Sequence, residues 1–242
     1  MLFSFSGTGN SLHVARTLLH PGEKLVNMAK GDHLYHLEKG ERVGFIFPVY
    51  CFTLSHVVLH FVQHLKLTGQ GYVFSVIVCG GNTGHAGAYL KEELSKRDIQ
   101  LNALFSLAMP DDMVFYYDLA SPEENQKKLR KAEQKLSVLK KTIEQEKQND
   151  PGSGFTSKMM QPVYYDAIRG TKAFHVNDAC IHCGKCERNC PDGIIRLVDG
   201  KPTWRASHCT KCSGCINRCH VQAIQYGRKT ENRFRYVHPE MK

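Results

Sequence analysis

The chain has 242 residues, of which 42% are hydrophobic and 23% charged, a composition that indicates a soluble globular protein with room for two domains. No apolar run approaches the roughly 18 residues of a membrane helix, and the first residues lack the basic flank of a secretory signal, so we expect a cytoplasmic protein without a membrane span. The formal net charge of +9 would suit nucleic-acid binding, but the basic residues are scattered, and we expect no nucleic-acid partner.

The first half of the chain alternates short apolar segments with helical ones, the order that builds a parallel sheet covered by helices on both faces. We expect strands over residues 1–5, 24–28, 42–47, 72–79 and 99–108. Helices are expected between them, over 10–19, 55–65 and 85–97. The predicted fold class is therefore α/β, with a five-stranded, doubly wound parallel sheet.

The first expected strand leads directly into a loop of small and hydroxyl-bearing residues, and a helix follows. A phosphate fits such a turn because backbone N–H groups can approach it, hydroxyls can donate to it, and the helix N-terminus carries partial positive charge. The absence of Gly-Lys-Ser/Thr excludes a Walker loop, and Leu12 replaces the third glycine of the dinucleotide fingerprint. The candidate phosphate-binding residues are Ser6, Gly7, Thr8, Gly9, Asn10 and Ser11.

Two further loops follow the third and fourth expected strands, at the sheet edge where open doubly wound sheets bind ligands. Their candidate residues for enclosing an aromatic ring are Pro48, Val49, Tyr50, Cys51 and Phe52, and Gly80, Gly81, Asn82 and Gly84. Residues 109–112 close the fifth strand and can complete the pocket. Tyr50 either stacks on the ring or is a core aromatic, and we interpret Cys51 and Cys79 as inert thiols.

Residues 121–148 carry the clearest helical pattern. Ser121 is the expected N-cap, Pro122 occupies the first turn, and Glu124 completes a capping box. The apolar positions form one stripe, at Leu129, Ala132, Leu136, Leu139 and Ile143. We interpret this as the last helix of the first domain, packed on the sheet, with a partner-binding helix as the alternative.

Eight of the ten cysteines crowd into residues 180–219, which favours a metal site over disulfides. The spacing Cys-x₂-Cys-x₂-Cys-x₃-Cys occurs twice with an offset of 29 residues, so the segment is internally duplicated. A cubane iron–sulfur cluster needs one thiolate on each of its four irons, and such a run supplies three of them. Zinc is the alternative, but it prefers two cysteine pairs separated by a longer loop.

Residues 175–226 resemble bacterial two-[4Fe–4S] ferredoxins, in which the fourth cysteine of each run ligates the other cluster. The resemblance assigns one cluster to Cys180, Cys183, Cys186 and Cys219, and the other to Cys190, Cys209, Cys212 and Cys215. One departure is that Cys219 precedes His220, whereas Cys190 precedes a proline as in that family.

For two groups of side chains, the basic residues near the cysteines and the histidines of one expected helix, a functional role and a solvated surface position are both open. Basic residues beside the ligands either raise the reduction potentials or are solvated surface charges, and they are Lys185, Arg188, Lys211 and Arg218. His56, His60 and His64 lie one turn apart on an expected helix, where they either bind a metal or form a solvated face. We favour the solvated face, because apolar residues at the other positions form the core side.

The loop from Ser6 to Asn10 resembles the flavodoxin phosphate loop, and together with the cysteine module the chain resembles the flavodoxin–ferredoxin fusion proteins of anaerobic bacteria and archaea. The resemblance implies FMN, with Tyr50 stacked on its ring, and two [4Fe–4S] clusters in a small α+β ferredoxin-like domain. It divides the chain into a flavodoxin-like FMN-binding domain over 1–148, a linker over 149–171, a ferredoxin domain over 172–227 and a basic tail over 228–242. Oxygen-labile clusters also imply anaerobic metabolism.

Clusters pass single electrons and FMN holds one or two, so we expect an iron–sulfur flavoprotein that links one-electron and two-electron redox partners. The first hypothesis is an electron carrier for other redox proteins, whose docking surfaces are acidic because this chain is basic. The alternative is a flavin-dependent reductase of a small organic or quinone-like substrate, which needs space above the flavin and a proton donor such as His85 or Tyr50.

Overall fold

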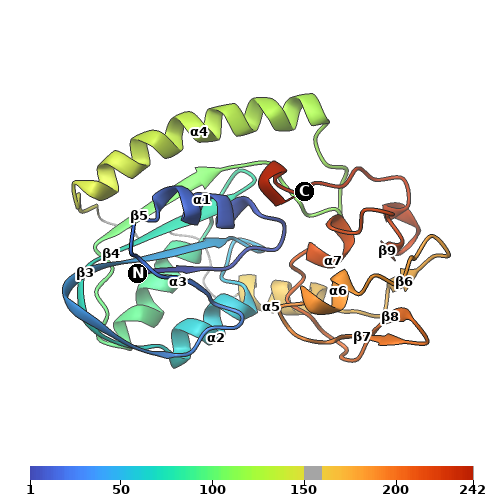
Figure 1. Ribbon diagram of the computed structural model, residues 1–242, viewed down its shortest axis with the longest axis horizontal. Coiled ribbons are helices and arrows are strands. Elements are labelled where there is room, and N and C mark those ends of the chain that lie inside the picture. Colours follow the sequence, from blue (N-terminus) through green and yellow to red (C-terminus); the bar gives the residue numbers. More distant parts are fainter. Residues whose placement is uncertain (150–159, 242) are drawn as a thin grey trace.

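The computed structural model describes residues 1–149 and 160–241 (Figure 1). Five strands form one parallel sheet in the order β2-β1-β3-β4-β5. They are β1 (Leu2–Ser4), β2 (Leu25–Asn27), β3 (Leu34–Pro48), β4 (Lys66–Cys79) and β5 (Ala103–Ala108). This is the strand order of flavodoxin-like doubly wound sheets, so the predicted fold class is confirmed.

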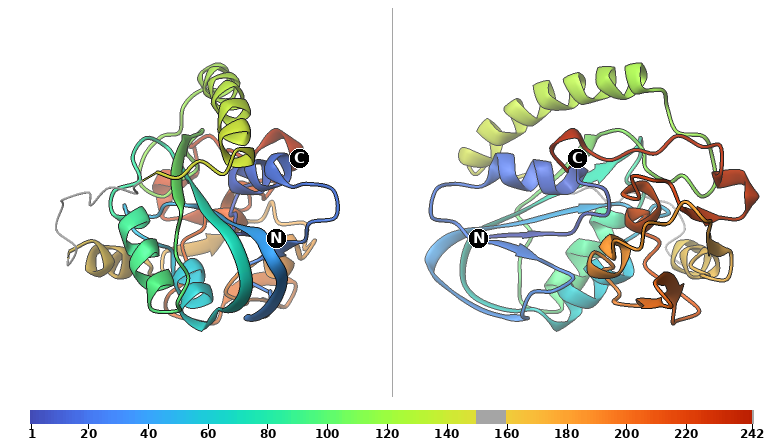
Figure 2. Two further views of the ribbon diagram at one scale, coloured as in Figure 1. Left: turned by 90° about the vertical axis from the view of Figure 1, so that its left-hand side faces the viewer. Right: turned by 45° about the vertical axis from the view of Figure 1, so that its right-hand side comes forward.

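Two pairs of helices cover the two faces of the sheet (Figures 1 and 2). They are α1 (Asn10–Leu18) with α4 (Pro122–Glu144), and α2 (His56–His64) with α3 (Ala86–Ser95). The apolar residues of α1 and α4 share a core with Leu2 and Phe74, whereas those of α2 and α3 pack with Phe3 and Phe45. Leu2 and Phe3 enter opposite cores because successive side chains of a strand point to opposite faces.

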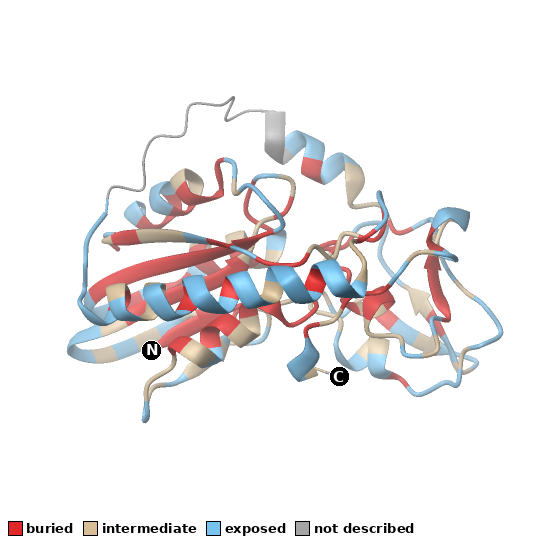
Figure 3. Cartoon of the chain, turned by 90° about the horizontal axis from the view of Figure 1, so that it is seen from above, coloured by how far each residue is buried: buried red, intermediate tan, exposed pale blue. Residues whose placement is uncertain are grey.

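Helix α4 lies on the sheet as its apolar stripe predicts. The Glu124 N–H donates to Ser121 Oγ, and the Ser121 N–H donates to the Glu124 carboxylate, which together form the expected capping box. Ala132, Leu136 and Ile143 are buried against the sheet, whereas the outer face of α4 is exposed (Figure 3). The sheet therefore covers the apolar stripe of α4, for which a partner-binding surface is the alternative interpretation.

Three strand boundaries differ from the prediction. Strands β3 and β4 begin at Leu34 and Lys66 rather than at residues 42 and 72, and they pair with each other along this extension. Because most residues of the extension are exposed, no apolar pattern marks it in the sequence. Strand β5 begins at Ala103 rather than at residue 99, since the buried apolar residues before it lie outside the ladder.

The C-terminal region is small and α+β. Its two antiparallel strand pairs are β6 (Phe174–Val176) with β9 (Ile224–Tyr226), and β7 (Ile195–Val198) with β8 (Lys201–Trp204). The helices α6 (Lys185–Arg188) and α7 (Gly214–Asn217) stand at equivalent positions of the two repeats. In the part of the chain that the structure describes, no helix combines the length and the apolar character needed to cross a bilayer.

The expected linker contains the helix α5 (Met160–Ile168), while residues 150–159 of that linker lie outside the described residues. Helix α5 docks on the sheet domain through Tyr165, which is buried among the residues of the α2 and α3 core. The Tyr165 hydroxyl donates to the Thr210 carbonyl at 2.7 Å. This residue therefore joins the sheet domain to the second cysteine run.

Residues 228–241 of the expected basic tail fold back onto the sheet domain. The segment contains two short 3₁₀ helices, η1 (Arg228–Thr230) and η2 (Pro239–Met241), and its end returns to helix α1 (Figure 1). Tyr236 and His238 are each only 4% exposed. The Tyr236 hydroxyl donates to Asn10 Oδ1 at 2.8 Å, so buried polar contacts hold this end of the chain on the first loop.

Candidate functional site

A cavity of about 600 Å³ lies at the carboxyl ends of the parallel strands and brings the three predicted loops together. The predicted residues that line it are Ser6, Gly7, Thr8, Asn10, Ser11, Pro48, Val49, Tyr50, Cys51, Phe52, Gly80, Gly81 and Asn82. Gly9 and Gly84 are the two predicted residues that do not line it. The anticipated closing segment after β5 contributes Pro110, Asp111 and Asp112 to the wall.

The first loop is shaped to receive an anion. Gly9 has a φ of +113°, and its N–H donates to Ser6 Oγ at 3.0 Å, which fixes the turn immediately before α1. Ser11 is 1% exposed, and its hydroxyl has no hydrogen-bond partner among the described residues. An orphaned hydroxyl beside a helix N-terminus is what a bound phosphate would satisfy.

A buried carboxyl group stands beside this loop. The Thr8 hydroxyl donates to the carboxylate of Asp112. Burial raises the pKa of Asp112 to about 7, although the hydrogen bond from Thr8 opposes the shift. An ionised Asp112 would repel a phosphate, so the protonation of this residue controls the electrostatics of the loop.

The second loop is a tight and strained turn. Tyr50 and Thr53 exchange two backbone hydrogen bonds, and the two residues between them, Cys51 and Phe52, have φ angles of +48° and +62°. Two consecutive positive φ values define the tight hairpin turn that normally contains Asn-Gly, so non-glycine residues store strain here. Burial raises the pKa of Cys51 to about 11, which keeps this thiol neutral, in line with the inert interpretation.

Tyr50 both lines the cavity and packs in the core, and its stacking on a ring stays a prediction. It lines the cavity, yet it is only 2% exposed and packs in the core edge-on to Phe5, with ring centroids 6.4 Å apart. Its hydroxyl has no hydrogen-bond partner within the described ranges. Burial, followed by the nearby thiol of Cys212, raises the pKa of Tyr50. Tyr50 therefore lies between the cavity and a predicted cluster ligand.

Gly84 supports the second loop from behind. It has a φ of +54°, and a Cβ at this position would lie 2.3 Å from Cβ of Phe52. The neighbouring His85 N–H donates to the Phe52 carbonyl at 2.9 Å. Gly84 thus permits the close approach of two loops rather than a contact with a ligand.

An aromatic rim surrounds the mouth of the cavity, and the sequence patterns did not reveal it. Its members are the exposed side chains of Phe52, Tyr116, Tyr117 and Tyr164. They come from three segments that are distant in the sequence. Only Phe52 was a candidate residue, because the others lie in segments without a ligand motif.

The two cysteine runs repeat each other in backbone conformation as well as in sequence. His182 and Gly184 in the first run have positive φ values, and so do Lys211 and Ser213 at the equivalent positions of the second. These left-handed residues bend the chain around the cysteines and turn backbone N–H groups toward a common centre. The backbone thus confirms the internal duplication.

Five of the eight clustered cysteines line one small cavity. This cavity is lined by Cys180, Cys183, Cys186 and Cys219, with Cys215 also on its wall. Burial raises the pKa of the Cys215 thiol, and the neighbouring thiols of Cys212, Cys209 and Cys190 raise it further. The ligation itself stays a prediction.

Backbone N–H groups also point at the sulfur atoms of both groups. The Ala223 N–H donates to Cys219 Sγ at 3.3 Å, and the Lys211 N–H donates to Cys209 Sγ at 3.4 Å. Hydrogen bonds of this kind tune the potential of a bound cluster.

Lys211 is not a solvated surface charge, which corrects one of the two interpretations given to it. It is 1% exposed, and its Nζ lies 3.5 Å from the ring centroid of Tyr226 and about 5 Å from those of Phe115 and Phe174. Nζ donates to the Gly170 carbonyl at 2.8 Å. Burial lowers the pKa of Lys211 to about 8, against the opposing effect of the nearby cysteines. Lys185 and Arg188, in contrast, are exposed.

The cavity and the second cysteine run touch through the backbone. A Cβ added to Gly7 would lie 2.0 Å from the carbonyl oxygen of Cys212, and one added to Gly214 would lie 3.0 Å from the Gly7 carbonyl oxygen. The Asn217 side-chain amide donates to the Asp112 carbonyl at 2.9 Å. The first loop of the sheet domain and the second cysteine run therefore form one continuous structure.

Comparison with known proteins identifies an iron–sulfur domain in the C-terminal part of the chain. Residues 165–224 match the model of the 4Fe-4S dicluster domain family. A 46-residue stretch, 19% of this chain, is 39% identical to one of the subunits of the ion-translocating oxidoreductase complex of Methanosarcina acetivorans. The match spans only 17% of that relative's length.

Two solved structures align with somewhat more than half of the chain. One is the Trp repressor binding protein of Bacillus subtilis, which is 11% identical, covers 58% of this chain and 96% of its own, and has a TM-score of 0.37. The other is an azoreductase of Bacillus anthracis, which is 12% identical, covers 57% of this chain and 97% of its own, and has a TM-score of 0.37. With TM-scores this low, the two alignments add nothing to the flavodoxin-like fold that the strand order shows. The chain is therefore a flavodoxin-like α/β region joined to an iron–sulfur domain of the 4Fe-4S type.

Proposed function

We propose that this chain is an iron–sulfur flavoprotein that transfers electrons between FMN and two [4Fe–4S] clusters, and thereby links one-electron and two-electron redox partners. The observation that carries the proposal is the backbone contact between Gly7 of the first loop and Cys212 of the second cysteine run. Electrons pass readily between two redox sites of one chain when the sites lie close together. This contact supports such a placement of the proposed flavin and cluster sites.

The residues around the larger cavity fit FMN. A volume of about 600 Å³ is ordinary for a cofactor site, and the orphaned Ser11 hydroxyl at the start of α1 suits the phosphate. Residues Ser6–Ser11 would hold the phosphate. The loops containing Tyr50 and Gly80 would enclose the flavin ring, and the buried Tyr50 would close the pocket on the side of the clusters.

The donor set of the C-terminal region fits two clusters. Eight thiols in two groups of four match the demand of two cubanes for one thiolate on each iron. When bound, the clusters carry single electrons and FMN carries one or two. The proposed ligand groups are Cys180, Cys183, Cys186 and Cys219, and Cys190, Cys209, Cys212 and Cys215.

The two proposed ligand groups differ in the exposure of their cysteines. Cys183 in the first run is exposed, whereas Cys209 is buried and Cys212 packs against the core of the sheet domain. The first group therefore faces outward, where a redox partner can dock, and the second group faces the flavin pocket. A partner with an acidic surface suits the basic character of the chain, and we place the protein in the anaerobic cytoplasm.

Cofactor analysis of the anaerobically purified protein tests this proposal. We expect about eight irons and one FMN per chain, and about half of the iron in the Cys180→Ser variant. Cys79→Ser is the matched control, because Cys79 is a cysteine outside both groups and should leave the iron content unchanged. Four irons in the wild type, or equal iron in both variants, would disprove the ligand assignment.

Partner recognition has its own test. Reduction of the protein by an acidic ferredoxin should slow as ionic strength rises, because screening weakens the attraction between opposite charges. A rate that is independent of salt would contradict docking through charge.

The aromatic rim favours a second candidate function, the reduction of a small aromatic or quinone-like molecule at the flavin. Phe52 is 51% exposed at the mouth of the cavity, where it can stack on such a substrate. Tyr50 is a poor proton donor for this reaction, because burial raises its pKa. Saturable quinone turnover that is weakened in Phe52→Ala but unchanged in Phe234→Ala, an exposed aromatic outside the rim, would identify a reductase.

A further inference from the structure

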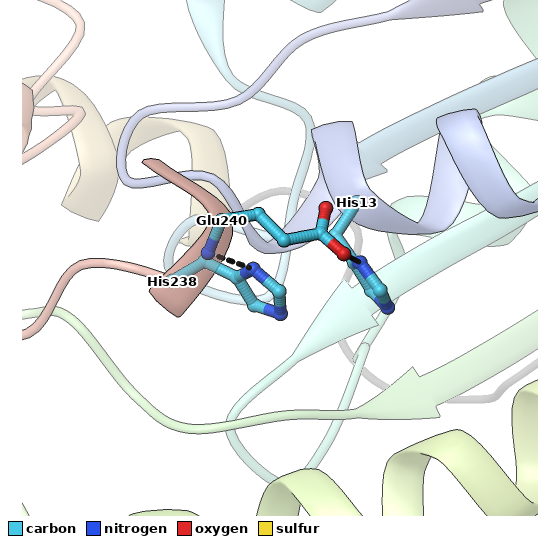
Figure 4. Close-up of side chains that lie close together, drawn as sticks. All are labelled: His13, His238 and Glu240. Carbon is cyan, nitrogen blue, oxygen red and sulfur yellow. Dashed lines mark hydrogen bonds and ion pairs between the residues drawn. The ribbon is translucent and has the colours of Figure 1, made fainter. Parts of the chain in front are cut away.

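The C-terminal segment places metal-binding side chains next to the first loop. The His238 N–H donates to the Thr8 carbonyl at 3.0 Å, and a Cβ on Gly9 would lie 2.8 Å from Cβ of His238. From this position His238 and Glu240 meet His13 of helix α1, as Figure 4 shows. The potential ligand atoms of the three residues all lie within 4.8 Å of one another.

The side chains of this cluster contact one another and the carboxylate of Glu133. His13 Nδ1 lies 2.8 Å from Glu240 Oε1, and His13 Nε2 lies 2.7 Å from Glu133 Oε1 on α4. The imidazole rings of His13 and His238 stack with their centroids 4.3 Å apart. His238 is 4% exposed, and its Nε2 has no hydrogen-bond partner among residues 1–149 and 160–241.

We propose that His13, His238 and Glu240 bind a divalent cation of the zinc class. Two imidazole nitrogens and one carboxylate oxygen form a common ligand set for Zn²⁺, with a water as the fourth ligand. Ligand atoms around Zn²⁺ are about 3.3 Å apart, so the cluster has to contract when it binds the ion. The Glu240 side chain is 49% exposed and free to make this movement.

The contact between Glu133 and His13 is a second observation that supports a bound cation. A histidine that ligates a metal through one nitrogen usually donates the other N–H to a carboxylate, which orients the ring. Glu133 occupies this position on His13. A simple ion pair of His13 with its two carboxylates would leave Nε2 of the buried His238 without a partner. A cation bound at Nε2 supplies that partner, and the ring proton then moves to Nδ1, which gives up the 3.4 Å hydrogen bond that it accepts from the Glu240 N–H.

The site would join three distant parts of the chain. His13 lies on α1, Glu133 on α4, and His238 with Glu240 on the C-terminal segment. A bound cation would hold that segment over the loop around Gly9. This inference does not depend on the flavin or the clusters, because zinc is counted separately from iron and FMN.

The test is zinc retention by the complete, anaerobically prepared protein. The protein is treated with EDTA, equilibrated with Zn²⁺, freed of unbound metal, and analysed for zinc, iron and flavin together. We expect about one zinc per chain in the wild type and none in His238→Phe or Glu240→Gln. In Glu133→Gln the affinity should fall about 10- to 100-fold.

His64→Gln is the matched control, because His60 and His64 form another pair of stacked imidazoles, 4.3 Å apart and exposed on α2. This variant should retain its zinc. Unchanged iron and flavin contents show that a variant is folded, and the exposed Glu240 allows a substitution that leaves the core intact. Hydrogen exchange in residues 235–241 should also slow when Zn²⁺ is added to the wild type.

Two results would overturn the proposal. One is a wild type that retains no zinc. The other is zinc that Glu240→Gln and His238→Phe retain as well as the wild type, or that His64→Gln loses, because the ion would then be bound elsewhere.

Discussion

Replacing Gly7 by alanine is expected to push the first loop, residues 6–11, away from the second cysteine run. The added methyl group would lie 2.0 Å from the Cys212 carbonyl oxygen and 3.0 Å from its carbonyl carbon. Ordinary contact begins near 3.4 Å, so the two segments have to separate by about 1.4 Å. Both partners are backbone, and therefore no side-chain rotation can relieve the clash.

Overpacking of this kind costs about 1–3 kcal/mol of the free energy of unfolding. For a chain of this size each kcal/mol lowers the Tm by about 2–4 °C, so the Gly7→Ala variant should melt about 2–12 °C below the wild type. Gly170→Ala is the matched control. Gly170 lies outside the cavity, a Cβ there meets nothing within 4 Å, and its Tm should stay unchanged.

Scanning calorimetry of the anaerobic holoproteins measures these Tm values. Stopped-flow spectroscopy then gives the rate at which the proposed flavin is reduced after the clusters, which should fall in Gly7→Ala and stay constant in Gly170→Ala. A Gly7→Ala variant with the same Tm as Gly170→Ala would refute the close backbone contact. A lower Tm with an unchanged flavin rate would instead refute this contact as the electron route.

Three further predictions concern charge and capping. Asp112 has a pKa of about 7 in the fold against 3.8 in the unfolded chain, so the folded state holds an extra proton between these values and the free energy of unfolding falls as pH rises from about 4 to about 7. Denaturation of the flavin-free protein should show this fall, and Asp112→Asn should lack it. Lys211→Met should make the potential of one cluster more negative in a redox titration monitored by electron paramagnetic resonance, whereas the exposed Lys185→Met should leave both potentials unchanged. Ser121→Ala should lower stability by about 0.5–2 kcal/mol through loss of the α4 cap, and Ser137→Ala in the exposed middle of that helix should change it little in the same unfolding assay.

Features that depend on local pattern could be predicted from the sequence. The alternation of apolar and helical segments indicates a parallel sheet. The loop beginning at Ser6 could be recognised because its small residues lie between an apolar strand and the start of a helix. The capping box at Ser121 is equally local. The cysteine spacing predicts the iron–sulfur domain because each run is a single tight loop.

Features that arise from long-range packing could not be predicted. Lys211 is charged, like most surface residues. It is buried because Phe115, Phe174 and Tyr226, which come from three segments, pack around its side chain. The basic residues near the C-terminus predicted a basic tail, and no sequence pattern indicated that Tyr236 holds that segment through a contact with Asn10. No sequence period encodes such contacts, since their partners are far apart in the chain.

The return of the C-terminal segment imposes an order on biosynthesis. Tyr236 follows its partner Asn10 by 226 residues, and so the first loop leaves the ribosome long before its cover exists. At a synthesis rate of about 5–20 residues per second, this delay is about 10–45 s. During that interval the sheet can assemble, but the first loop stays open to solvent. The nascent chain would therefore lay this segment on the first loop last, after the strands of the sheet have paired.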